Sequence, residues 1–291
     1  PMFALAWLIP LLPLLAAAWI AGGYALLGNR GEAGERMTAR VAVGAAALSL
    51  GLAALTGIQA LVMGPPGQVR VGSWLVSGDL RVDIVFTLDA LGLALLPLVA
   101  FVALVTLRFS VNYLHREAGF PRFFLLLSLF MGAMELIVMA GNAVLVFIGW
   151  ELAGVASYLL IAYNFERPVA VANAQRAFIA NRIGDAGFLL GISFAYLWMG
   201  GTDWPLRPDQ ALDPIQGDLI ALAFLLPALA KSAQLPFAPW VARALEGPTP
   251  SSAIFYGALM VHAGVYLLIR LEPLLETTPA IASLIALLGA L

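Results

Sequence analysis

Long apolar runs separated by short polar loops fill the chain. Nine of these runs approach the roughly 20 residues that a helix needs to cross a bilayer, and we predict each of them as a transmembrane helix. They cover residues 3–27, 41–63, 85–107, 123–140, 143–163, 174–199, 219–235, 252–271 and 280–291. The pattern predicts an all-α polytopic membrane protein. Because the chain opens on proline and its last run stops abruptly, we expect a fragment whose missing part is C-terminal.

One polar stretch, at residues 64–84, has a different periodicity. From residue 68 to 83, apolar and polar side chains are interleaved, with a break at Ser77, Gly78 and Asp79. Alternation around such a turn is typical of a β-hairpin. We expect a short external hairpin that caps the loops; a docking element is the alternative.

Composition agrees with a membrane protein, since 62% of residues are hydrophobic and 11% are charged, with a mean hydropathy of +0.94. The near-neutral net charge of −2 argues against a nucleic-acid partner. The chain has no cysteine and only two histidines, far apart in sequence, so we expect neither a metal site nor a thiolate-bound cofactor. It also lacks a glycine-rich phosphate-binding motif. We therefore predict no catalytic redox residue and no cofactor in this chain.

Arginine positions predict the orientation. One side of the predicted bundle carries Arg30, Arg36, Arg40, Arg108, Arg116, Arg122, Arg167, Arg176 and Arg243. The other carries only Arg70, Arg81, Arg207 and Arg270, together with Asp203, Asp209, Asp213 and Asp218. The positive-inside rule makes the first side cytoplasmic and the N-terminus external. We expect the membrane to be a bacterial inner membrane.

Lys231, the only lysine, lies inside an apolar run. An ionisable residue at membrane depth is costly and usually marks an ion path, a proton relay or a buried partner. Pro227 precedes it, and Pro236 and Pro239 follow, so the helix should kink or break there. Burial disfavours a charged amine, so lysine could exchange a proton near neutral pH, which arginine cannot do. We favour a relay over a static ion pair.

Glu151, the only charge in its predicted helix, is the expected counter-ion of Lys231. A protonated, hydrogen-bonded carboxyl is the alternative. Arg182 and Asp185 are three residues apart and should share a helix face near its cytoplasmic end. They form either a local salt bridge or the polar mouth of a path to Glu151 and Lys231.

Two further residues are candidates for the same path. Glu135 lies deep in the fourth predicted helix and is either an additional proton stop or a protonated, hydrogen-bonded carboxyl. His262 has chemistry suited to proton transfer, although a neutral histidine bonded to a neighbouring helix is the ordinary case. His115 lies in a loop, where we expect it to be solvated.

Six motifs, in this order along the chain, resemble subunit 5 of proton-pumping NADH:quinone oxidoreductase and its relatives in Mrp-type antiporters. They are TLDALGLALLPLVAFVALV, YLHREAGFPRFF, GWELAGVASYLLIAYNFERP, ANRIGDAGFLLG, AKSAQLPFAPWVARALEGPTPSSA and AGVYLLIR. The resemblance implies inverted five-helix repeats, each with a discontinuous helix. It divides the chain into three leading helices (1–120), one complete repeat (121–272) and the start of a second repeat (273–291).

The resemblance also assigns residues. It makes Glu151 the family glutamate, Lys231 the relay lysine at the helix break, and Arg182 with Asp185 the mouth of the first half-channel. Tyr256 stands where the family has histidine, and His262 stands where threonine or lysine is expected. The onward path from Lys231 is therefore either shifted along the helix or differently connected.

The function that follows is proton translocation in a multi-subunit membrane complex. Flavin and iron–sulfur clusters are expected in partner subunits, where electron transfer would occur. A Mrp-type sodium/proton antiporter and a bicarbonate or CO2 uptake complex are the alternatives, since relatives share these motifs. A purely structural scaffold is disfavoured because it would not need buried Glu151 and Lys231.

Overall fold

The computed structural model describes residues 2–26, 28, 31–208 and 212–291, with the side chains at 256–258 left out. Arg30 and Asp209, which enter the predicted orientation, lie outside the described residues. Within the described part, six helices are long and apolar enough to cross a membrane. They are α1 (Leu8–Leu26) with the 3-10 turn η1 (Met2–Leu5), α2 (Gly31–Met63), α3 (Ala90–Tyr113), α4 (Phe120–Met139), α5 (Ala143–Ile161) and α7 (Pro214–Lys231).

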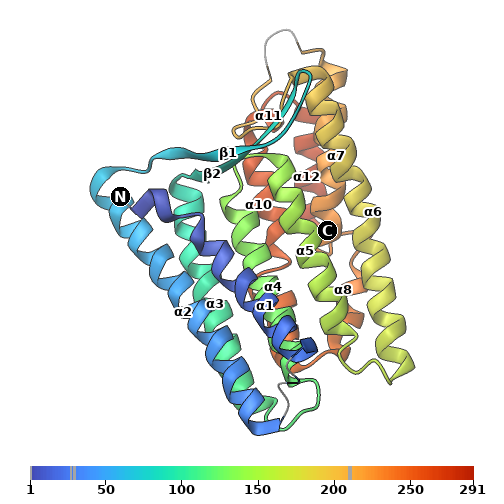
Figure 1. Cartoon of the computed structure of the whole chain (residues 1–291). Coiled ribbons are helices and arrows are strands. Elements are labelled where there is room, and N and C mark those ends of the chain that lie inside the picture. Colours follow the sequence, from blue (N-terminus) through green and yellow to red (C-terminus); the bar gives the residue numbers. More distant parts are fainter. Residues whose placement is uncertain (1, 27, 29–30, 209–211) are drawn as a thin grey trace.

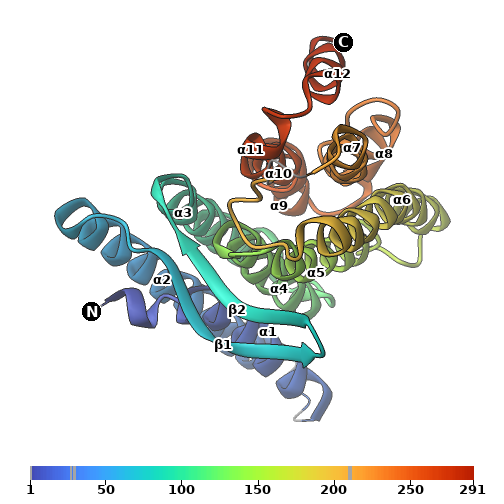
Figure 2. The same ribbon diagram turned by 90° about the horizontal axis from the view of Figure 1, so that it is seen from above.

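The other helices complete the bundle (Figure 1). They are α6 (Pro168–Met199), α8 (Pro239–Arg243), the 3-10 turn η2 (Ala244–Glu246), α9 (Thr249–Ser252), the π-helix η3 (Ala253–Ala258), α10 (His262–Arg270), α11 (Glu272–Leu275) and α12 (Pro279–Ala290). All nine predicted runs are therefore mainly helical, although the run at 252–271 is divided into three pieces. Seen from above, α4 and α5 lie centrally and α12 lies at the outer edge (Figure 2).

The third predicted helix, 85–107, begins too early and ends too early. Residues up to Leu88 belong to a strand, and α3 starts at Ala90 because Asp89 caps it by accepting a hydrogen bond from the N–H of Gly92 at 2.9 Å. Apolar periodicity alone could not separate the end of a buried strand from the start of a helix.

The predicted hairpin is confirmed. Strands β1 (Gly67–Ser77) and β2 (Leu80–Leu88) pair antiparallel around the two-residue loop at Gly78 and Asp79. The hairpin crosses one end of the bundle (Figure 1). There the Asn142 side chain donates to the Asp83 carbonyl at 2.9 Å, and the Tyr196 hydroxyl donates to the Arg81 carbonyl at 3.0 Å. These contacts with the cap of α5 and with α6 favour the predicted capping role.

Close packing of α6 on α7 positions the candidate site. Gly184, Gly187 and Gly191 form one face of α6, and a Cβ on Gly184 would lie only 2.5 Å from the Cβ of Ala230. A Cβ on Gly191 would lie 2.9 Å from the ring of Phe224. Small residues at a fixed spacing allow membrane helices to approach closely. The side chains flanking this face are therefore held against the last turn of α7.

A buried arginine connects the leading helices to the rest of the bundle. Arg270, at the end of α10, forms an ion pair with Asp89 at the start of α3 and donates to the Tyr266 hydroxyl at 2.8 Å. Tyr266 in turn donates to the Val138 carbonyl of α4 at 2.5 Å. Burial opposes ionisation of Asp89, but hydrogen bonds from Arg270 and the Gly92 N–H hold the pKa of that carboxyl below its usual range.

We expect Arg270→Gln to destabilise the protein by about 2 kcal/mol, because hydrogen bonds to charged groups contribute on that order. Thermal unfolding followed by intrinsic fluorescence in detergent should show a lower melting temperature. Arg207→Gln is the matched control, since Arg207 is an exposed arginine on the same end of the bundle. Equal melting temperatures for the two variants would contradict the assignment of this ion pair as a structural connection.

Candidate functional site

The predicted helix break beside Lys231 is confirmed. Helix α7 begins at Pro214 after a capping box on Asp213 and ends at Lys231. Ala233 then takes a φ of 51°, which a residue with a Cβ seldom adopts. A non-helical segment leads on to the short helix α8. The break leaves Lys231 in the last turn, where the C-terminal end of the helix dipole favours a cation.

Lys231 is only 1% exposed. Its ammonium donates to the Trp150 carbonyl of α5 at 3.2 Å and lies 5.2 Å from the centre of the Trp150 ring. One turn farther along the same face of α5, a Cβ on Gly154 would lie 3.4 Å from Nζ. Among the described residues, no carboxylate forms an ion pair with this ammonium. A carbonyl and an aromatic face thus provide its direct polar contacts.

The direct pair of Glu151 with Lys231 predicted from the sequence is therefore not the arrangement of this structure. Glu151 instead forms an ion pair with Arg182 of α6. The same guanidinium forms the predicted pair with Asp185, whose carboxylate lies 3.0 Å from Nε. Arg182 competes successfully because its planar fork can contact two carboxylates at once. Glu151, Arg182, Asp185 and Lys231 are hereafter the charged cluster.

The structure also corrects the position of Arg182 and Asp185. Because α6 begins at Pro168, Arg182 is 14 residues into a helix of 32 residues. That distance corresponds to about 21 Å along the axis, so the pair lies near the middle of the helix rather than near its predicted cytoplasmic end. Both residues of the pair consequently stand at the depth of Glu151 and Lys231.

Three polar atoms of the charged cluster, Glu151 Oε1, Arg182 Nη2 and Asp185 Oδ1, are buried without a hydrogen-bond partner from the described residues. Arg182 Nε and Asp185 Oδ2 face each other in the ion pair but are not aligned for a hydrogen bond. Such atoms are ordinarily satisfied by water, because leaving them unpaired is expensive. These unsatisfied polar atoms favour a water-filled path around the charged cluster. Proton movement between carboxylates and an amine requires such a path.

Glu135 is separate from the charged cluster. It is fully buried in α4 and faces α2, where Ser49 Oγ lies 2.7 Å from its Oε1. The same hydroxyl lies 3.0 Å from the Ile9 carbonyl of α1. A hydroxyl has one hydrogen to donate. Ser49 can donate to only one of these two oxygens, so a protonated Glu135 that donates to Ser49 would account for both contacts, while Glu135 Oε2 has no partner among the described residues. The hydrogen-bonded alternative stays a prediction.

His262 stands at the start of α10 with an exposed side chain, beside a mainly apolar cavity of about 120 Å³. Ser232, which follows Lys231, donates to the carbonyl of Val261, which precedes His262, at 2.7 Å. The two predicted relay residues thus adjoin a direct contact between α7 and α10. Tyr256 lies in the π-helix η3, a geometry often found at functional sites; its side chain lies outside the described residues.

His115 is not free in its loop. Its ring pairs with Glu35 of α2 at 2.9 Å, although the side chain is half exposed. Two partners could not be predicted from the sequence: Arg182 for Glu151, and Asp89 for Arg270. The sequence shows single charged residues inside separate apolar runs. Which of these residues form ion pairs depends on how the helices pack.

Comparison with known proteins confirms the resemblance. A family model described as the transmembrane part of NADH:quinone oxidoreductase and Mrp antiporters matches residues 140–291, and a model of the complex I chain 5 N-terminus matches residues 74–124. The charged cluster and His262 lie within the first match. Glu135 falls between the two.

The chain is 35% identical to NAD(P)H-quinone oxidoreductase chain 5 of Picosynechococcus sp., over 100% of this chain and 45% of the relative. It is 36% identical to the chloroplastic subunit 5 of Anthoceros angustus, over 99% and 40%. It thus spans less than half the length of these curated relatives.

Among solved structures, the Mrp complex from Dietzia sp. aligns with a TM-score of 0.75 and 28% identity, over 93% of this chain and 29% of that one. An archaeal membrane-bound sulfane sulfur reductase aligns with a TM-score of 0.82 over 98% and 56%; at 20% identity this supports the fold alone.

Proposed function

The chain belongs to the NADH:quinone oxidoreductase/Mrp antiporter transmembrane family, and from this premise we propose that it translocates protons within an NADH:quinone oxidoreductase-like complex. The charged cluster would carry the protons through the membrane. Flavin and iron–sulfur subunits would perform the electron transfer, so the complex acts as a proton-pumping oxidoreductase and this chain supplies only its ion path.

One observation carries the proposal. Lys231, 1% exposed, lies at the break of α7 beside a carbonyl and an aromatic ring, while Arg182 holds the nearby Glu151. Burying a charge without a directly paired counter-ion is expensive, and a membrane protein retains it where the charge has a function. If the side chain at position 231 only filled space between the helices, an apolar residue would stabilise the fold equally well.

We propose that Arg182 acts as the switch between two states. When Arg182 pairs with Glu151, the Lys231 ammonium lacks a direct carboxylate and can release its proton to water in the path. When Arg182 turns fully to Asp185, Glu151 is free to approach Lys231 and stabilises its protonated form. Because these groups are coupled, they exchange protons as a unit. The direct Glu151–Lys231 pair then belongs to the second state.

The finer architecture is part of the same proposal. Nine spans, with α6, the α9 to α10 segment and α12 added to the six apolar helices, would give three leading helices, a five-helix repeat over 121–272 and the start of another at 273–291. The N-terminus and the hairpin would face outward across a bacterial inner membrane. Arg36 near the start of α2, and Arg108 and Arg116 near the end of α3 and just after it, belong to the end of these helices away from the hairpin, which supports this orientation.

Antiport of sodium and protons is the second candidate. The Dietzia Mrp complex supports it, since that complex aligns over 93% of this chain. The charged cluster would serve either function, because both need a buried group that binds and releases a proton. The two functions differ in what drives the ion and in which partners assemble.

Purification of the complex from its native membrane, followed by reconstitution into liposomes, tests the proposal. We expect flavin and iron–sulfur subunits to co-purify and NADH oxidation to acidify the vesicle lumen. Small hydrophobic subunits alone, with proton movement driven by a sodium gradient, would replace the proposal by the antiporter. Robust NADH oxidation without any ion movement would contradict both.

A further inference from the structure

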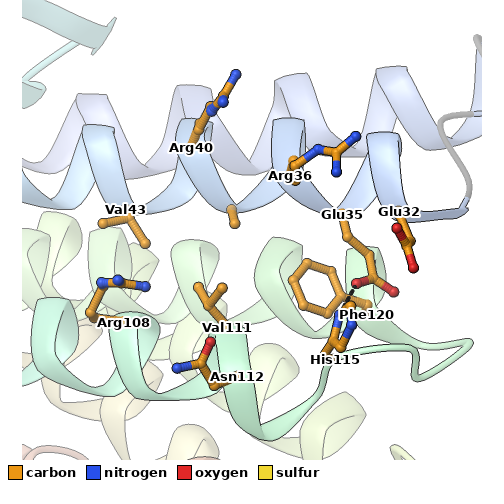
Figure 3. A pocket seen from close by; sticks show the side chains of 11 residues that line it. Glu32, Glu35, Arg36, Arg40, Val43, Arg108, Val111, Asn112, His115 and Phe120 are labelled. Carbon is orange, nitrogen blue, oxygen red and sulfur yellow. Dashed lines mark hydrogen bonds and ion pairs between the residues drawn. The ribbon is translucent and has the colours of Figure 1, made fainter.

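A groove opens between α2 and α3 at the end of the bundle opposite the hairpin. It encloses about 520 Å³, within the range of small-ligand pockets. Figure 3 shows that its basic side chains come from both walls, Arg36 and Arg40 from α2 and Arg108 from α3, although the guanidinium of Arg40 points away from α3. We call these three residues and the space between them the arginine groove.

The positive charge of the arginine groove is not neutralised locally. Glu32 and Glu35, which also line the groove, bind the loop after α3 instead. Glu35 contacts the ring of His115 at 2.9 Å and the Arg116 N–H at 3.1 Å, and Glu32 contacts the Arg116 guanidinium at 3.1 Å. Among the described residues, the three groove arginines have no ion pair. Three like charges around one groove favour an anion between them.

The arginine groove also lies at a defined membrane depth. Helix α2 has 33 residues, or about 50 Å, whereas the hydrocarbon core is about 30 Å thick. Its apolar run begins at residue 41, directly after Arg40, and that of α3 ends at residue 107, directly before Arg108. The arginines therefore stand at the level of phospholipid headgroups.

Apolar surface continues from the groove toward the membrane centre. Of its apolar lining, Val43 lies on the membrane side of the arginines, whereas Ala39, Val111 and Phe120 lie level with them or beyond them. Farther along, Leu48 of α2 and Val105 of α3 are 63% and 50% exposed. A molecule with an anionic head and hydrocarbon chains would contact both the arginines and the exposed apolar side chains. A free inorganic anion would contact only the arginines.

We propose that the arginine groove binds the headgroup phosphate of an anionic phospholipid, whose acyl chains lie along the exposed apolar faces of α2 and α3. Basic pockets between transmembrane helices on the cytoplasmic side have this chemistry. The bound lipid would fasten the leading helices together from the membrane. This role is independent of the charged cluster.

The test uses photoactivatable phosphatidylglycerol in liposomes that contain the purified complex, with cross-linked peptides mapped by mass spectrometry. Phosphatidylcholine carrying the same photoreactive group is the zwitterionic control. We expect the anionic probe to label peptides of α2 and α3 around the groove. Arg36→Gln with Arg108→Gln should lower that labelling at least about tenfold, given the contribution of each interfacial arginine.

Arg176→Gln with Arg243→Gln is the matched control variant. It also removes two arginines from the predicted cytoplasmic side, but from a different groove, and should leave the labelling unchanged. Equal labelling by phosphatidylcholine, or equal losses in the two double variants, would overturn the proposal. Displacement of the probe by inorganic phosphate would assign the groove to the free anion, and absence of labelling in the intact complex would also overturn the proposal.

Discussion

Replacing Lys231 by alanine is expected to abolish NADH-driven proton translocation through this chain while the complex still assembles. The ammonium is the only buried amine at the break of α7, and alanine can neither bind nor release a proton there. Proton uptake into inverted membrane vesicles, followed with a pH-sensitive dye, measures the effect. Blue native electrophoresis of the same membranes checks assembly.

Lys231→Arg separates the charge of the side chain from its ability to exchange a proton. Arginine retains the positive charge but does not deprotonate in proteins. We therefore expect this variant to assemble and to fail in translocation as Lys231→Ala does. Normal pumping by Lys231→Arg would mean that a fixed charge is enough, and the proposed relay would have to be abandoned.

The elements of the fold could be predicted from the sequence wherever the signal was local. Pro227 with Pro236 and Pro239 predicted the break of α7, and alternation around Gly78 predicted the hairpin. Both depend on backbone rules that act over a few residues. The start of α3 could not be predicted, because the apolar end of β2 runs into the helix and only the cap at Asp89 separates them.

The charged cluster was predicted in membership and in its Arg182–Asp185 pair, but the partner of Glu151 was not predicted. Glu151, Arg182, Asp185 and Lys231 could be selected because a charge inside an apolar run is unusual. The partner of Glu151 depends on how the glycine face of α6 packs on α7 and on how Arg182 of α6 meets α5, which no spacing along the chain encodes. The link between Arg270 and Asp89, 181 residues apart, was missed for the same reason.

Glu151→Gln is expected to reduce proton translocation at least about tenfold, because a hydrogen bond to a charged group contributes about 1.5–3 kcal/mol and each 1.36 kcal/mol changes a rate tenfold. The amide keeps the shape of the side chain but removes the negative charge that Arg182 contacts. Arg182 would then remain with Asp185, so the switch would stay in one state. Proton uptake per NADH oxidised is the quantity to compare.

Glu135→Gln is the matched control for Glu151→Gln, since both substitutions replace a carboxyl in neighbouring central helices. Glu135 contacts Ser49 of α2 rather than the charged cluster, and glutamine can donate to that hydroxyl as a protonated carboxyl does. We therefore expect nearly normal translocation from Glu135→Gln. If it were impaired as severely as Glu151→Gln, Glu135 would lie on the proton path, and a path confined to the charged cluster would be wrong.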